Sequence, residues 1–323
     1  MNDLKITRDI KLKSDFGDVY YDLYEPSFLD SNTESKPLNI IQISHGMLEH
    51  KGRYENLAKQ LAAANFIVAV SDHRGHGNSI NAEHKITLGE MGEDGLHKAT
   101  YDLYKLNRTL FDKYKTTNTP KIILLGHSMG SIIARRYIML YADSIDCLIL
   151  SGSPSLDSRA KSGILMAKIF RLLGLNNIGS KIMHKKILGE FNKPFKNDKN
   201  GGNWMSSNKE VVEAFKNDPK CQAIFSINSI ISLLNGLLEV YDDYPKVKNA
   251  NLPILFVSGY DDPCGQNGDG VKFARDHLIK QGYLNVDLLL YENTRHEVFN
   301  EKIAPNAIKD ILLWLRNNGI TNE

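Results

Sequence analysis

The sequence predicts an α/β fold in which helices flank a mostly parallel sheet and a helical segment is inserted late in the chain. Short apolar runs rich in β-branched residues alternate with amphipathic helical patterns, as expected of buried parallel strands and their crossover helices. The alternation stops at residue 156 and resumes after residue 244. We therefore expect one sheet domain, residues 1–155 and 245–323, that carries a helical cap at residues 156–244.

The first half of the chain supplies six of the expected strands. Residues 6–24 alternate apolar and polar side chains around Phe16-Gly17-Asp18, which predicts an antiparallel hairpin. A polar loop, Ser31 to Lys36, follows it. Beyond this loop, strands are expected at residues 38–44, 66–71, 121–125 and 147–150, and helices at residues 54–65, 92–114 and 130–141.

The second half begins with the expected cap. Helical patterns at residues 163–175 and 221–240 are joined by a Lys/Asn/Gly-rich loop at residues 193–203, without a clear strand. After the cap, strands are expected at residues 252–257 and 286–290, and helices at residues 270–281 and 305–317. The prediction is thus a mostly parallel sheet of eight strands.

Composition narrows the function classes. The chain has 323 residues, 42% of them hydrophobic and 24% charged, which is typical of a globular protein rather than a fibrous or disordered one. The net charge is only +2, whereas a protein that binds nucleic acid usually has a stronger basic stripe. The three cysteines form no CxxC pair, and the chain shows neither a secretory h-region nor 18 consecutive apolar residues. These features favour a cytoplasmic protein.

The most informative motif is Gly126-His127-Ser128-Met129-Gly130, which lies between an expected buried strand and an expected helix. A sharp strand-to-helix turn exposes a serine hydroxyl at the end of a sheet, and glycines on either side relieve the crowding there. The motif indicates Ser128 as a nucleophile. His127 is expected to pack beside the turn rather than to act in catalysis.

A serine nucleophile needs a base and an acid, which in this architecture follow late strands in the order acid, then histidine. The loop after residue 257 contains the adjacent Asp261 and Asp262, and spacing alone leaves both open as the acid. Two histidines lie further downstream. His277 falls within an expected helix, so His296, in a loop, is the better candidate for the base.

Acyl transfer also needs hydrogen-bond donors for an oxyanion. They are expected to be the backbone amides of Met129, which follows the nucleophile, and of Met47, in the loop where Gly46 keeps the backbone close to the turn. The segment Asp72-His-Arg-Gly-His76 has two histidines three residues apart, but it lacks a helix or a second ligand cluster. No metal or organic cofactor is expected.

These motifs resemble those of the α/β-hydrolase superfamily, in its monoacylglycerol lipase and lysophospholipase branch, which is grouped with the serine aminopeptidase-like hydrolases. The resemblance covers about residues 17–315 and implies an α/β-hydrolase fold with Ser128, Asp262 and His296 as catalytic triad. Asp262 is favoured over Asp261 because it fills the last place of Gly-x-x-Asp. Met47 replaces the smaller residue that many relatives have. The matching segments are His45-Gly-Met-Leu-Glu-His50, Gly52-Arg-Tyr54, Asp72-His-Arg-Gly-His-Gly-Asn-Ser79, Gly126 to Gly130, Gly259-Tyr-Asp-Asp262 and His296.

The resemblance implies a serine ester hydrolase acting on monoacylglycerols, lysophospholipids or similar single-chain esters. The cap helices have more apolar residues than one covered face needs, which favours an acyl pocket or a lipid-facing surface, although simple burial against the sheet domain explains them equally well. Lysines at positions 181, 185, 186, 193, 196 and 199 suggest transient contact with a membrane surface, or only a solvated face. The residues expected to contact substrate are Gly46, His127, Leu165, Ile169 and Leu234.

Two other functions stay open at this stage. A proline-type serine aminopeptidase would need an acidic clamp for the substrate's amine, and the cap acids Glu190, Glu210, Glu213 and Asp242 show no readable arrangement for one. A non-catalytic ligand-binding protein would keep the fold without the activity. No protein partner is inferred.

Overall fold

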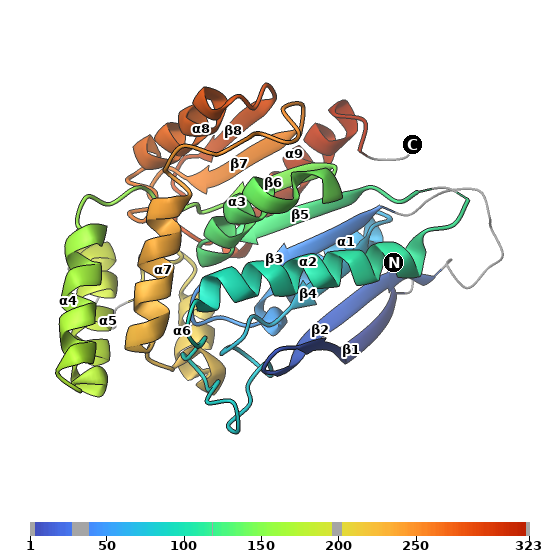
Figure 1. Ribbon diagram of the computed structural model, residues 1–323. Helices are drawn as coiled ribbons and strands as arrows, with labels where there is room; N and C mark the ends of the chain where they lie inside the picture. Colours follow the sequence, from blue (N-terminus) through green and yellow to red (C-terminus); the bar gives the residue numbers. More distant parts are fainter. Residues whose placement is uncertain (1–3, 28–38, 118, 196–201, 321–323) are drawn as a thin grey trace.

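The computed structural model describes residues 4–27, 39–117, 119–195 and 202–320. Its eight-stranded sheet has the order β1-β2-β4-β3-β5-β6-β7-β8, which confirms the predicted mostly parallel sheet (Figure 1). The predicted loop Ser31 to Lys36, Leu38 of the third predicted strand, and Lys196 and Lys199 lie outside the described residues. The strands are β1 (Leu4–Ser14), β2 (Gly17–Pro26), β3 (Ile40–Ser44), β4 (Ile67–Ser71), β5 (Ile122–His127), β6 (Cys147–Ser151), β7 (Ile254–Gly259) and β8 (Val286–Tyr291).

The sheet is antiparallel at one edge and parallel elsewhere. Strand β2 pairs antiparallel with both β1 and β4, and the six strands from β4 to β8 run parallel. Their carboxyl ends therefore meet at one edge of the sheet, where the arrowheads of Figure 1 point toward the inserted helices. Ligands bind at this edge in open α/β sheets because the loops that follow the strands converge there.

Helices cover both faces of the sheet, so the parallel strands are buried on both sides. On strand β5, Ile122 and Leu124 join one apolar core, and Ile123 and Leu125 join the other. Side chains alternate across a strand, which explains why the sequence of a doubly covered strand is continuously apolar. The first core holds α2 (Gly95–Tyr114), α3 (Met129–Tyr141) and α8 (Asp269–Gln281); the second holds α1 (Glu55–Ala63) and α9 (Ala304–Asn317).

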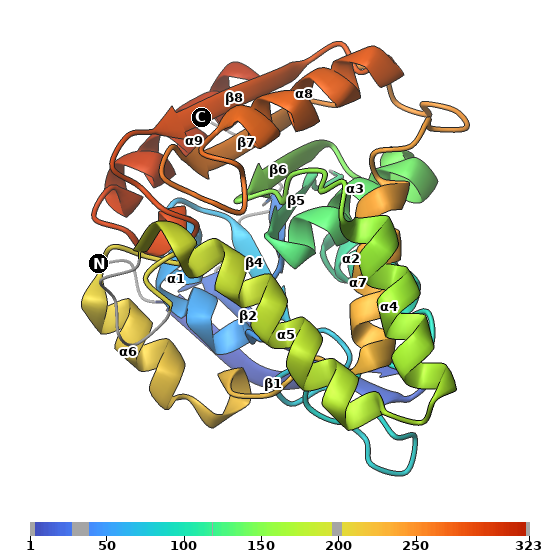
Figure 2. The same ribbon diagram turned by 90° about the vertical axis from the view of Figure 1, so that its left-hand side faces the viewer.

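The chain between β6 and β7 folds into α4 (Ala160–Leu172), α5 (Asn176–Asn192), α6 (Lys209–Asn217) and α7 (Ile227–Glu239), which we call the cap helices. Figures 1 and 2 show them beyond the carboxyl ends of the strands. Backbone amides of Met91 and Leu96 donate to the hydroxyls of Ser229 and Ser232 on α7. These bonds fix α7 against the sheet domain.

The helical patterns at residues 163–175 and 221–240 correspond to α4 and α7, whereas α5 and α6 were not predicted. Both α4 and α7 also begin or end a few residues away from the expected bounds. Within the described ranges, no helix combines the length and the apolar character that crossing a bilayer requires.

Candidate active site

Ser128 lies at the turn between β5 and α3, with a backbone φ of 52° and ψ of −119°. Few residues other than glycine adopt such a conformation, and here its amide donates to the carbonyl of Ser151 at 2.9 Å. A Cβ atom on Gly130 would lie 2.1 Å from the carbonyl oxygen of Ser44, and one on Gly126 would lie 2.4 Å from the carbonyl oxygen of Gly130. The close approach of backbones therefore requires both glycines of the motif.

The structure brings together His296 and Asp262, the base and the acid expected from the sequence. The Nδ1 of His296 lies 2.9 Å from Oδ2 of Asp262, and the backbone amide of Cys264 donates to the other carboxylate oxygen at 2.8 Å. Asp261 is exposed to solvent, so of the two adjacent aspartates only Asp262 faces the imidazole. Burial lowers the pKa of His296, but the negative charge and hydrogen bond of Asp262 outweigh this effect and raise it above the usual value.

Ser128 and His296 line the same cavity. Among the residues that the structure describes, the buried Nε2 of His296 has no hydrogen-bond partner. A free imidazole nitrogen on a cavity that also has a serine in its wall is the kind of group that can act as a general base. His277, set aside from the sequence, is instead in α8, where its Nδ1 lies 3.5 Å from the guanidinium of Arg135.

The two expected oxyanion donors, Met47 and Met129, also line this cavity. Met129 is the first residue of α3, so its amide has no acceptor within the helix. The loop of Met47 is held by His45, whose Nε2 accepts from the amide of His73 at 3.0 Å. Gly46 lies beneath the loop, where an added Cβ would meet Glu49 Oε1 at 2.2 Å.

Sequence reasoning missed a buried charge cluster beside the triad. Arg53 donates to Glu49 Oε2 at 2.7 Å and to both carboxylate oxygens of Glu297 at 2.7 and 2.9 Å. Glu49 in turn accepts from the amide of Gly46 at 3.1 Å, and Glu297 follows His296 directly. One guanidinium thus links the loop of Met47 to the loop of His296. The only sequence signal is that Glu49 and Arg53 stand in segments quoted for the family resemblance.

The pKa values of the two carboxylates in this cluster are shifted in opposite directions. Burial raises the pKa of Glu49, and the arginine only partly offsets it. Burial would also raise the pKa of Glu297, but its bidentate pairing with Arg53 lowers the value well below the usual range. As the pH falls, Glu49 is therefore protonated before Glu297, which stays the ionised partner of Arg53.

The cavity above Ser128 has a volume of about 720 Å³. Its walls come mainly from the cap, and they include Leu234, one of the residues expected to contact substrate. Trp204, in the cap segment before α6, lies with its ring centroid 4.8 Å from that of His296. Apolar side chains line much of the remaining wall: Met166, Met183, Ile187, Phe191, Leu233 and Leu237.

Four of the residues predicted to contact substrate do not line this cavity. Leu165 and Ile169 are on the outer side of α4, with 62% and 48% of their surface exposed, and do not line the cavity. His127 is buried behind the elbow, 3.3 Å from the hydroxyl of Ser151, and Gly46 is covered by the loop that it supports. Helical spacing cannot tell which apolar face of an amphipathic helix points inward.

The histidines of the segment from Asp72 to His76 support the fold. The Nε2 of His73 lies 2.9 Å from Ser44 Oγ, and the Nδ1 of His76 lies 3.0 Å from the carbonyl of Arg74. Burial lowers the pKa of His73 to about 3 and that of His76 to about 4. Asp72 accepts from the amides of Lys51 and Asn78 and so holds the loop in shape.

The chain matches a known protein family and named relatives along most of its length. The family model described as serine aminopeptidase, S33, matches residues 35–303. The chain is 27% identical over 300 residues to a monoacylglycerol lipase from Mycolicibacterium smegmatis, with 92% of each chain covered. It is 26% identical over 298 residues to human monoglyceride lipase, which covers 88% of this chain and 84% of the relative.

Solved structures show the same architecture. A thermostable carboxyl esterase from Bacillus coagulans in complex with glycerol superposes with a TM-score of 0.82 at 25% identity, covering 97% of this chain and 98% of the other. A soluble variant of monoglyceride lipase from Saccharomyces cerevisiae, in complex with a substrate analog, gives a TM-score of 0.72 at 16% identity over 97% and 96% of the two chains. The second likeness supports the fold alone.

Proposed function

The chain belongs to the serine aminopeptidase, S33, family and is a serine ester hydrolase, and within that class we propose that it acts on monoacylglycerols or lysophospholipids. The observation that carries the proposal is the cavity of about 720 Å³, which has Ser128 and His296 in its wall and apolar cap side chains around it. A single acyl chain buries well in such a site, while its ester carbonyl stays beside the serine.

The proposed mechanism is two-step acyl transfer. Ser128 attacks the ester carbonyl as His296 accepts its proton at Nε2, and Asp262 holds the Nδ1 proton and stabilises the imidazolium. The amides of Met47 and Met129 donate to the oxyanion. The imidazolium then protonates the departing alcohol, and water, activated by the same histidine, releases the fatty acid and restores the serine.

The charges of the cavity favour an ester over a peptide substrate. A peptidase that recognises a free amine needs an unpaired carboxylate. Among described residues, the carboxylates in the cavity wall are each engaged by an arginine: Glu49 and Glu297 by Arg53, and Asp157 and Glu190 by Arg159. The other acids considered from the sequence, Glu210, Glu213 and Asp242, are exposed outside the cavity.

The substrate proposal is tested by comparing initial rates on three substrate classes. We expect turnover of monoacylglycerols or lysophosphatidylcholine, with an optimum in acyl-chain length, and no turnover of aminoacyl and prolyl anilides. Preferential cleavage of the anilides would establish the aminopeptidase instead. Lipid binding without turnover of any substrate would establish the non-catalytic ligand-binding alternative.

We further propose that the cap, taken as residues 156–244 with residues 1–155 and 245–323 as catalytic domain, docks on a lipid surface through the α4–α5 hairpin. Leu172 and Leu173 at the tip expose 86% and 63% of their surface. Such a concentration of exposed apolar side chains is costly in water and typical of an interaction surface. Further exposed apolar residues on the hairpin are Leu165, Ile169, Leu175, Ile178 and Ile182.

Charge on the same hairpin points to an anionic bilayer as the occupant. Basic side chains that are exposed on α4 and α5 are Lys161, Lys168, Arg171, Lys181, Lys185 and Lys186. Apolar residues beside basic ones on a helical surface match the boundary between headgroups and acyl chains. Lys193, also considered from the sequence, is instead paired with Glu190.

Liposome flotation tests this docking. We expect binding to vesicles that contain phosphatidylglycerol, weaker binding at high salt, and loss of binding in Leu172→Asp. The matched control is Leu284→Asp, because Leu284 is 76% exposed but lies outside the cap. Equal flotation of both variants would contradict docking through the hairpin.

A further inference from the structure

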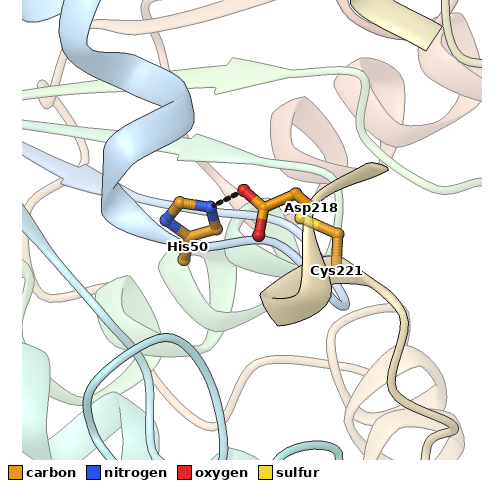
Figure 3. Close-up of side chains that lie close together, drawn as sticks. All are labelled: His50, Asp218 and Cys221. Atoms are coloured by element: carbon orange, nitrogen blue, oxygen red, sulfur yellow. Dashed lines mark hydrogen bonds and ion pairs between the residues drawn. The ribbon is translucent and has the colours of Figure 1, made fainter. Parts of the chain in front are cut away.

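A second group of reactive side chains lies where the cap meets the sheet domain. His50 ends the loop that carries Met47, while Asp218 and Cys221 flank the short turn between α6 and α7 (Figure 3). The Nε2 of His50 lies 2.7 Å from Oδ2 of Asp218. One ligand atom from each of the three residues lies within 4.8 Å of the other two.

We propose that His50, Asp218 and Cys221 form a binding site for a borderline-soft divalent cation such as Zn²⁺, which would fasten the cap to the sheet domain. This inference does not depend on the proposed lipid substrate. Imidazole nitrogen, carboxylate oxygen and thiolate sulfur are the donors that Zn²⁺ takes in proteins. Mg²⁺ and Ca²⁺ are disfavoured because they bind oxygen donors.

The distances suit such an ion after a small adjustment. With Zn–N of about 2.0 Å and Zn–S of about 2.3 Å, tetrahedral ligands stand roughly 3.3–3.7 Å apart. The His50 Nε2 and Asp218 Oδ2 atoms are closer than this, at 2.7 Å. The ligand atoms of the three residues are separated by up to 4.8 Å, which is farther than an ion requires. Closing the site therefore takes movements on the order of 1 Å among the three ligand atoms.

The surroundings orient Asp218 and leave room for the His50 ring. The amide of Lys220 donates to Oδ1 of Asp218 at 2.9 Å, which leaves Oδ2 toward His50. An added Cβ on Gly52 would contact the His50 ring at 2.8 Å, so glycine at this position leaves room for the imidazole. A hydrogen bond such as that from Lys220 holds a metal ligand in place before the ion arrives.

Binding requires a defined proton balance. In the cation-free protein the His50 Nδ1 accepts from the amide of Gly52 at 3.2 Å, so Nε2 carries the proton that is donated to Asp218. Ligation through Nε2 moves the imidazole proton to Nδ1 and breaks this long hydrogen bond with Gly52. Cys221 is buried, which raises the pKa of its thiol to about 12, so binding also releases the thiol proton to solvent.

The experiment is equilibrium dialysis of the full chain against ZnCl₂, followed by metal analysis, with CoCl₂ as a spectroscopic probe. We expect one ion per chain and a thiolate-to-Co²⁺ charge-transfer band in the wild type. Both are lost in Cys221→Ala, and the affinity falls at least tenfold in Asp218→Asn. Cys147→Ala is the matched control, because Cys147 is a buried cysteine of β6.

A second variant separates this site from the catalytic groups. Asp262, Cys264 and His296 also place one ligand atom each within 4.8 Å of the others. If Cys264→Ala keeps the ion, the site formed by His50, Asp218 and Cys221 is supported. If Cys264→Ala loses the ion while Cys221→Ala keeps it, the proposal is overturned. Failure of the wild type to retain Zn²⁺ overturns it as well. If Cys221→Ala does not fold, Asp218→Asn decides: at the same concentration, Zn²⁺ must raise the melting temperature of the wild type by more than that of this variant, and equal rises overturn the proposal.

Discussion

The indole ring of Trp204 lies against the imidazole of His296, with 4.8 Å between the ring centroids. Two hydrogen bonds reinforce this contact between the cap and the histidine loop: Glu297 donates from its amide to the carbonyl of Met205, and Arg295 donates to the carbonyl of Asn203. The cap therefore both forms the cavity wall and contacts the loop that carries His296.

Trp204→Ala should impair turnover of a long-chain monoacylglycerol more than that of a soluble short-chain ester. The substitution removes an apolar wall as well as support for His296, and truncation of a buried tryptophan costs about 3–5 kcal/mol of unfolding free energy. Steady-state kinetics on both substrates check this. Trp314→Ala on α9 is the control, and equal losses of kcat/KM in both variants would argue against a special role for Trp204.

Asp262→Asn should lower kcat by on the order of 10⁴ while the fold persists, because the amide no longer holds the productive imidazole tautomer. Asp261→Asn alters the exposed neighbour and should keep a near-normal rate. Purified variants, with circular dichroism to confirm folding, are compared on one ester. A large loss in Asp261→Asn with a normal rate in Asp262→Asn would reverse the assignment.

The pH dependence of kcat/KM should report the influence of Asp262 on His296. Only the neutral imidazole accepts the serine proton, so activity rises as pH increases through the pKa of His296. Since Asp262 raises this pKa, the acidic limb should lie above the usual histidine value in the wild type and move to lower pH in Asp262→Asn. A limb that does not move would mean that another group controls it.

Arg53→Met should cost about 3–5 kcal/mol of unfolding free energy, because it leaves buried carboxylates without their counter-charge. Arg159 pairs with Asp157 and Glu190 but is 58% exposed, so Arg159→Met should cost about 1 kcal/mol or less. Urea unfolding measures both. Similar losses in the two variants would show that burial of the Arg53 cluster contributes little.

Gly189→Ala should stabilise the protein by about 0.4–1 kcal/mol, because Gly189 lies within α5 and an added Cβ meets nothing within 4 Å. Gly130→Ala should instead unfold or inactivate the protein, since its Cβ would collide with the backbone of Ser44. Thermal melts distinguish the two. A tolerated Gly130→Ala would show that the elbow is less tightly packed than the structure indicates.

The sequence predicted the sheet well because doubly covered strands such as β5 and β7 are continuously apolar. It missed α5 because Asn176, Gly179 and the exposed Ile178 and Ile182 blur the apolar face of that helix. It missed α6 because that helix is short, and Val212 is its one fully buried residue. Both helices are formed through contacts within the cap rather than by a strong local pattern.

Some residues of the candidate site could likewise be expected from the sequence, and others could not. Turn chemistry and chain order identified Ser128 and His296, because a sharp turn has a local sequence signature. The pairing of Arg53 with Glu297 joins residues 244 positions apart and has no such signature. Whether Leu165 faced the cavity or solvent depended on how α4 packs, which helical periodicity does not encode.

Labelling with a fluorophosphonate, read by intact-protein mass, tests the assignment of Ser128 most directly. We predict one adduct on the wild type, no adduct on Ser128→Ala, and parallel loss of ester hydrolysis in that variant. An adduct that persists in Ser128→Ala, or a folded wild type that hydrolyses esters without labelling, would contradict it.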